Sequence, residues 1–260
     1  MNGCRGTAPF RERMRKGILG VFDTFAWVRA MWEGGSAATG FLDDYSDLDL
    51  VMVVEDDRVE EAFRLFESFL EAEYGITRRF RMPEPCWHGH GQCFYFIEDC
   101  PPLYYIDLLV EKLSSNERLL EPDRHGKALV WLDRDGIVTG EGSDPLELSR
   151  RRSGFLGMLG ATLPLTLVET RKQIARGNAI DAVAQYQRFL SGKLAGLLNL
   201  KYRPERFDFG IRYADRDYPD GVNTRLERLL YPSSPDALPA LLDEAEEWCR
   251  ELLEGAAREE

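Results

Sequence analysis

The stretch WEGGSAATGFLDDYSDLDLVMVV, residues 32–54, contains a glycine turn followed by a strand-like run with two acids. Asp47 and Asp49 alternate with leucines and lead into the apolar residues 50–54, which predicts a β-strand with both carboxylates on one face. Two carboxylates this close repel each other unless a cation lies between them. A hard divalent ion with oxygen ligands, Mg²⁺ first of all, suits this pair.

A phosphate site is expected just before this strand. Gly34, Gly35 and Ser36 lie between a short strand-like segment and a short predicted helix, and the backbone N–H groups at a helix start bind anions well. Glycine also lets the backbone approach a phosphate closely. Ser36 has a simpler alternative role as the N-cap of that helix. Together with the acid pair, the turn suits a Mg²⁺-bound nucleoside triphosphate.

A third acid interrupts a second apolar run, YIDLLV at residues 105–110. An unpaired carboxylate inside a core strand is costly, because it leaves water without gaining a partner. The presence of Asp107 is explained if its side chain faces the same way as those of Asp47 and Asp49. We therefore expect the three acids to form one site.

Composition restricts the classes of partner. The 260 residues carry a formal net charge of −12, which disfavours nucleic acid, since phosphate backbones are bound by clustered lysines and arginines. The charge mildly favours a cationic acceptor, although solubility alone also explains it. Five irregularly spaced cysteines fit a reducing cytoplasm, and no signal peptide or apolar run of about 20 residues is apparent, so no membrane association is expected. The oligomeric state stays open.

The hydrophobic pattern changes near Gly142, from mixed strands and helices to helices alone. Ser143, Asp144 and Pro145 have the composition of a helix start. Before this point we expect helices at 10–22 and 59–74, strands at 27–32, 47–54, 76–82, 93–97 and 103–110, and a hairpin of 128–132 with 136–139. After it we expect one kinked helix or two separated by Pro164 over 145–176, then helices at 180–200, 222–230 and 236–254.

Two further features have competing interpretations. Lys193, on the flank of the predicted helix 180–200, is a candidate to bind the triphosphate, or it is a solvated lysine. The segment that contains Cys86, His88, His90 and Cys93 offers four zinc-binding side chains, but its spacing matches no common zinc module. The alternative is a loop at the edge of the binding site.

The combination of Gly-Ser, ten further residues, Asp-x-Asp and a later strand with one acid resembles the DNA polymerase β-like nucleotidyltransferase superfamily. Residues 25–60 look most like the nucleotidyltransferases of aminoglycoside or lincosamide antibiotics and their uncharacterised bacterial relatives, and the likeness is looser to about residue 140. The resemblance implies an α+β protein. Its nucleotidyltransferase domain, residues 1–142, would have a small mixed sheet with flanking helices, and residues 143–260 would form an all-α helical bundle.

The resemblance also implies roles for the site residues. Asp47 and Asp49 would hold two Mg²⁺ ions, and Asp107 would bind the ion beside the acceptor hydroxyl and act as general base or orient that hydroxyl. Gly35 and Ser36 would bind the β- or γ-phosphate. The expected reaction transfers AMP from ATP to a hydroxyl of a small, possibly aminoglycoside-like molecule. Transfer to a protein or RNA, or a catalytically silent nucleotide-binding or sensor module of the same fold, are the alternatives.

Overall fold

The chain folds into two compact units, residues 1–143 and residues 144–260. The computed structural model describes residues 7–84, 86, 88–116 and 118–259. Within these residues, every helix is too short or too polar to cross a membrane.

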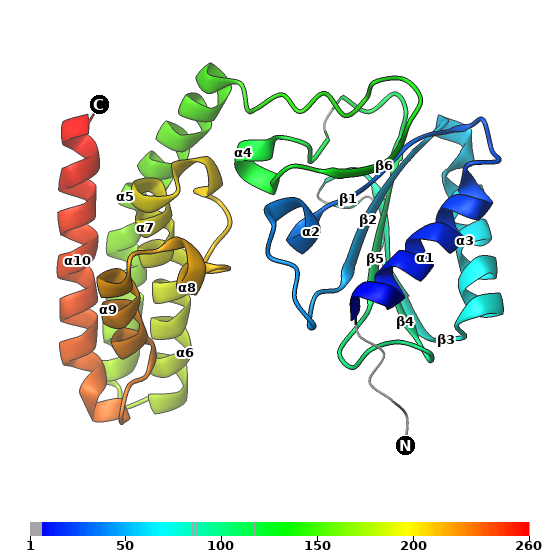
Figure 1. Cartoon of the computed structure of the whole chain (residues 1–260). Helices are drawn as coiled ribbons and strands as arrows, with labels where there is room; N and C mark the ends of the chain where they lie inside the picture. Colours follow the sequence, from blue (N-terminus) through cyan, green and yellow to red (C-terminus); the bar gives the residue numbers. More distant parts are fainter. Residues whose placement is uncertain (1–6, 85, 87, 117, 260) are drawn as a thin grey trace. The chain divides into compact units, whose positions relative to one another are not determined.

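A six-stranded mixed sheet organises the first unit (Figure 1). Its strand order is β3-β4-β5-β2-β1-β6, in which only β2 and β5 run parallel to each other and the other neighbours are antiparallel. The predicted α+β class is confirmed. The strands are β1 (Val28–Glu33), β2 (Leu48–Val54), β3 (Ile76–Arg81), β4 (Gly91–Ile97), β5 (Ile106–Lys112) and β6 (Leu129–Asp133).

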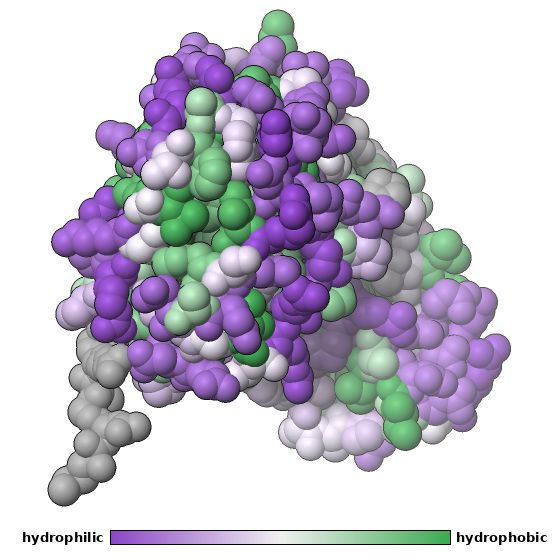
Figure 2. All heavy atoms as spheres, turned by 90° about the vertical axis from the view of Figure 1, so that its right-hand side faces the viewer, coloured by the Kyte–Doolittle hydropathy of each residue, from purple (hydrophilic) through white to green (hydrophobic). Residues whose placement is uncertain are grey.

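Helices α1 (Thr7–Phe22) and α3 (Val59–Glu73) cover one face of this sheet (Figure 1). A short 3₁₀ turn, Asp56–Arg58, leads into α3. The main core lies between helices and sheet, and β2 contributes every second residue from Leu48 to Val54 to it. Figure 2 looks onto the helix-covered side, where hydrophobic side chains gather near the middle and hydrophilic ones surround them.

The opposite face of the sheet receives the alternate residues of the same strands. A smaller core there is formed by Ala30, Trp32, Val51, Val53 and Leu109. The short helices α2 (Gly35–Thr39) and α4 (Pro122–His125) lie on this side (Figure 1). Because side chains alternate along a strand, Asp49 and Asp107 belong to this second face.

The predicted hairpin of residues 128–132 and 136–139 is wrong. Its first half is β6, which pairs with β1 at the edge of the sheet, while Ile137 and Val138 are not in a strand. The Asp133 carboxylate accepts hydrogen bonds from the backbone N–H groups of Ile137 and Val138, at 2.9 and 3.0 Å. The Asp133 side chain therefore accepts from the backbone N–H groups that a second strand would have used for pairing.

The second unit is entirely helical. Asp144 caps its first helix by accepting hydrogen bonds from the N–H groups of Leu146 and Glu147. This helix continues through Pro164 as one element, so the single-helix alternative holds. The predicted helix 180–200 is instead divided by a π-helical turn, Leu190–Leu194. The remaining elements are α5 (Pro145–Ala175), α6 (Ala179–Phe189), α7 (Ala195–Tyr202), α8 (Ala214–Asp217), α9 (Asp220–Leu230) and α10 (Leu238–Glu259), with 3₁₀ turns at Pro204–Arg206 and Pro235–Ala237.

Candidate active site

Strands β2 and β5 place two carboxylates side by side. Asp49 and Asp107 are direct partners in the parallel register of these strands. Neighbouring strands lie about 4.8 Å apart, so the two side chains leave the same face at adjacent positions. Asp47 lies two residues before Asp49, immediately ahead of β2, and all three acids are half-buried.

An arginine of α1 fixes the chain where it enters β2. Arg11 donates hydrogen bonds from Nη1 to the backbone oxygens of Ser46, at 3.2 Å, and Asp47. Its Nη2 forms an ion pair with Glu33, which is only 4% exposed at the end of β1. Two secondary-structure elements therefore hold the backbone that carries Asp47. The sequence gives no signal for this role, because Arg11 looks like any polar residue of an amphipathic helix.

The glycine turn packs directly against Asp49. The N–H of Gly34 donates to the backbone oxygen of Asp49 at 2.8 Å. Gly35 has φ +50, and a Cβ at this position would lie 1.7 Å from Oδ2 of Asp49. A residue with a side chain would thus be strained and would displace the carboxylate. The alternative role of Ser36 as an N-cap is wrong: Gly34 is the N-cap, and Ser36 lies inside α2.

A chain of hydrogen bonds holds Asp107. Gln92 of β4 donates from Nε2 to both carboxylate oxygens, at 2.8 and 2.9 Å. Oε1 of Gln92 lies 3.1 Å from Nε2 of His88, whose Nδ1 accepts the backbone N–H of His90 at 3.1 Å. Because Nδ1 is an acceptor, the ring proton is assigned to Nε2, and His88 donates to Gln92. The sequence did not mark Gln92 as a site residue, because the predicted strand began at residue 93. Its spacing of two and four residues from Phe94 and Phe96 is the signal that could have placed it on their face of the strand.

The electrostatics link the acids to their surroundings. Burial raises the pKa of Asp107, and the negative charge of Asp47 raises it further, while the donors of Gln92 and the His88 ring act in the opposite direction. Burial also raises the pKa of Tyr105, and the neighbouring Asp47 carboxylate raises it further. A cation bound among these groups would be stabilised by the same charges that now repel one another.

The donor set suits a hard divalent cation, because the three carboxylates supply only oxygen ligands. In the present side-chain positions, Asp49 packs on Gly35 and Asp107 is held by Gln92. Over the described residues, no three or more His, Cys, Asp or Glu side chains are arranged to hold a metal ion. Binding of Mg²⁺ by the three acids therefore requires their carboxylates to turn toward one another, while the backbone can stay in place.

The zinc hypothesis for Cys86, His88, His90 and Cys93 is wrong for a geometric reason. Cys93 lies in the main core, on the face covered by α1 and α3. Gln92, its neighbour in β4, faces the opposite side and contacts His88. The ring of His88 stacks on that of His90 at 5.4 Å, so the histidines lie on the side of the sheet that Cys93 faces away from.

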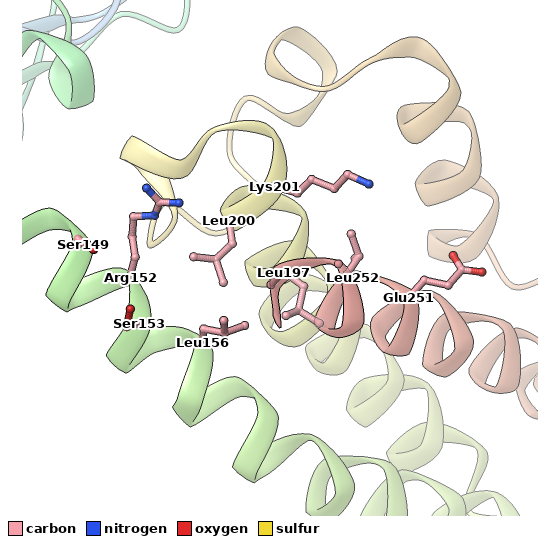
Figure 3. Close-up of a pocket in the computed structure, with 11 residues that line it drawn as sticks. Ser149, Arg152, Ser153, Leu156, Leu197, Leu200, Lys201, Glu251 and Leu252 are labelled. Atoms are coloured by element: carbon pink, nitrogen blue, oxygen red, sulfur yellow. The ribbon is translucent and has the colours of Figure 1, made fainter. Parts of the chain in front are cut away.

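In the helical unit, Lys193 is bound to a neighbour within its own unit. It lies in the π-helical turn, and Nζ donates to Oγ1 of Thr162 on α5 at 2.5 Å. A separate cavity of about 560 Å³ lies between α5, α7 and α10, where Arg152 and Lys201 surround a floor of leucines (Figure 3). The contribution of Lys193 to nucleotide binding stays a prediction.

Comparison with known proteins gives likeness in structure only. No family model and no curated protein matches the sequence. An aminoglycoside 6-adenyltransferase from Bacillus subtilis is similar at 14% identity and a TM-score of 0.34, over 95% of this chain and 90% of that one. A nucleotidyltransferase-like protein from Exiguobacterium sibiricum is similar at 15% identity and a TM-score of 0.40, over 94% and 75% of the two chains.

A third similar structure is a STING-associated c-di-GMP synthase from Capnocytophaga granulosa, at 14% identity and a TM-score of 0.32, over 96% of this chain and 81% of that one. These names agree with the nucleotidyltransferase resemblance of the Gly-Ser and Asp-x-Asp motif. Identities and TM-scores this low carry no argument about activity. The function is therefore argued from the residues of the site.

Proposed function

We propose that the first unit is a Mg²⁺-dependent nucleotidyltransferase that moves AMP from ATP to a hydroxyl group of a small molecule. One observation carries the proposal: the parallel register of β2 and β5 sets Asp49 beside Asp107, and Asp47 lies two residues before Asp49. The second support is the turn at Gly35, which lies against the Asp49 carboxylate. Oxygen ligands for a cation and backbone donors for a phosphate thus come from adjacent segments.

Each residue has a distinct role in this proposal. Asp47, Asp49 and Asp107 would hold Mg²⁺, which neutralises the charge of the triphosphate when bound. The N–H groups at Gly35 and Ser36 would donate to phosphate oxygens. Asp107 would orient the acceptor hydroxyl and receive its proton as the oxygen attacks the α-phosphorus. The bond from that phosphorus to the leaving pyrophosphate would break in the same displacement.

In the protein without metal, burial raises the pKa of Asp107, and a carboxylate with a raised pKa is a better base than an ordinary one. Gln92 would keep that carboxylate oriented toward the acceptor through its two N–H donors. The net charge of −12 favours a small-molecule acceptor over a nucleic acid. Lys193 is retained as a candidate for nucleotide binding.

The test is pyrophosphate release from ATP, with and without Mg²⁺, across a panel of hydroxyl-bearing acceptors. We expect acceptor-dependent release that Asp49→Asn lowers by about 1,000-fold or more, since the change removes a ligand of the catalytic ion. Asp57→Asn, at an exposed aspartate just beyond β2, is the matched control and should retain activity. Equal rates for wild type and Asp49→Asn would refute the mechanism. ATP binding without release for any acceptor would favour a silent nucleotide-binding module.

A further inference from the structure

Four aromatic side chains form a continuous strip on the carboxylate face of the sheet. We call Phe80, Phe94, Phe96 and Tyr105 the aromatic strip. Phe80 and Phe94 are partners across β3 and β4, and their rings stack with centroids 6.3 Å apart. The Tyr105 ring lies 6.3 Å from that of Phe94 and 6.0 Å from that of Phe96. The contacts therefore join residues of β3 and β4 to the residue just before β5.

The strip adjoins the three acids. Phe94 is the direct partner of Asp107 in the pairing of β4 with β5. Tyr105 lies two residues before Asp107 along the same extended segment, so its side chain leaves the same face of the sheet. A molecule that covers the strip would consequently reach the carboxylates without leaving the sheet surface.

The strip is open to solvent although it is apolar. Phe80 is 54% exposed and Phe96 is 44% exposed, while Phe94 and Tyr105 are half-buried. On the other face of the same strand, Cys93, Tyr95 and Ile97 are buried under α1 and α3. Adjacent exposed rings cost free energy in water, so their retention next to a polar site points to a ligand that covers them.

The strand order separates the strip from the phosphate-binding turn. The order β3-β4-β5-β2-β1 puts the aromatic strip, on β3 and β4, to one side of the acids. The turn at Gly35 follows β1 and lies on the other side. Phosphates bound at the turn would thus lie on the opposite side of the acids from the strip, which leaves the strip to the second substrate.

Charge beside the strip helps to define that substrate. Arg78 is exposed, pairs with Phe96 across the strands, and makes no ion pair with any residue that the structure describes. Its neighbour Arg79 faces the other side and is bound by Glu67. The guanidinium of Arg78 repels a cationic group placed directly beside it, and it can stack on a planar group or bind an oxygen.

We infer that the acceptor is a small molecule with a planar apolar or aromatic ring, which stacks on the aromatic strip and directs a hydroxyl toward Asp107. This inference rests on the proposed function and names its substrate class. It takes the place of the aminoglycoside-like acceptor, because the saturated rings of an aminoglycoside offer no planar face that could stack across the strip.

Direct binding of 2-naphthol as a probe, followed by ligand-observed NMR, tests the inference without turnover. The double variant Phe80→Ala/Phe96→Ala removes the two exposed rings and should weaken binding by about 10-fold or more. Tyr231→Ala removes an exposed aromatic ring of the helical unit and should leave binding unchanged. A dissociation constant that is the same for wild type and the double variant would overturn the inference. A change of oligomeric state caused by the double variant would also overturn it, because the strip would then belong to an interface with a second copy of the chain.

Turnover separates this inference from the proposed function. Pyrophosphate release with ring-bearing alcohols should fall in the double variant, whereas the affinity for a non-hydrolysable ATP analogue should stay the same. Weaker ATP binding would assign the strip to the nucleotide base and overturn the inference. Release with kanamycin that the double variant leaves unchanged would also overturn it, while the proposed function would stand. If the probe bound in a strip-dependent way but no acceptor gave pyrophosphate release, the proposed function would be contradicted and the binding site supported.

Discussion

A buried glutamate in the first unit predicts an unusual dependence of stability on pH. Glu111 of β5 is fully buried. Its Oε2 is paired with Arg118 at 2.7 Å, and Nε2 of His90 lies 3.8 Å from Oε1. Burial raises the pKa of Glu111 from its ordinary value of 4.5 to about 7, although Arg118 opposes the shift. The folded protein therefore favours the protonated form of this side chain.

The direction of this pH dependence is set by the protonation of Glu111 in the folded and the unfolded protein. Between pH 4.5 and about 7, Glu111 is ionised in the unfolded chain and protonated in the folded one, so the folded state binds more protons. Stability then falls as pH rises through this window, and the loss is complete above it. A pKa difference of this size corresponds to about 3 kcal/mol, as an upper estimate for a side chain with a buried ion-pair partner.

Glu111→Gln keeps the shape of the side chain and removes its ionisation. We expect the variant and the wild type to be about equally stable near pH 4.5, and the variant to be more stable at pH 8 by up to about 3 kcal/mol. Urea unfolding at pH 4.5, 6, 7 and 8, followed by tryptophan fluorescence, measures the difference. Glu98→Gln, at an exposed glutamate after β4, is the control and should follow the wild type at every pH. A difference between Glu111→Gln and wild type that does not grow with pH would refute the reasoning.

Three further changes probe the site. Gly35→Ala should abolish activity and cost about 1–2 kcal/mol of stability, because the residue has φ +50 and the new Cβ would collide with the Asp49 carboxylate. Gly40→Ala is the control: it has φ +77 but no neighbouring atoms, so it should lower stability and retain activity. Gln92→Leu removes both N–H donors from Asp107 and should lower kcat/KM by about 10- to 100-fold with little change in the KM for ATP; unchanged kcat/KM would contradict this. Lys193→Met should raise the KM for ATP by about 10-fold, and an unchanged KM in steady-state kinetics would limit this lysine to its hydrogen bond with Thr162 of α5.

The strands and most helices follow from periodicity in the sequence. Alternation around Asp47 and Asp49 gives their common face, and the apolar run around Asp107 marks the neighbouring strand. Local pattern does not give the register, however, and it is the register that sets Asp49 beside Asp107. The roles of these residues in catalysis stay predictions.

Other features depend on contacts between residues far apart in sequence. Gln92 donates to Asp107 only once β4 and β5 have paired. Arg11 likewise reaches the backbone ahead of β2 only in the folded unit. The hairpin after β6 was wrong because a side chain, Asp133, takes the backbone donors of the turn. The division of the predicted helix 180–200 by a π-helical turn has no signal in the hydrophobic pattern, which continues through it.

The central claim is that Asp47, Asp49 and Asp107 meet around a divalent cation. Crystals grown with Mn²⁺ and a non-hydrolysable ATP analogue test it most directly, because the anomalous signal locates the ion. We predict a Mn²⁺ peak within about 2.0–2.3 Å of oxygens from all three carboxylates and from the triphosphate. A nucleotide complex whose ion lies elsewhere, with the Asp107 carboxylate out of coordinating range, would contradict the account.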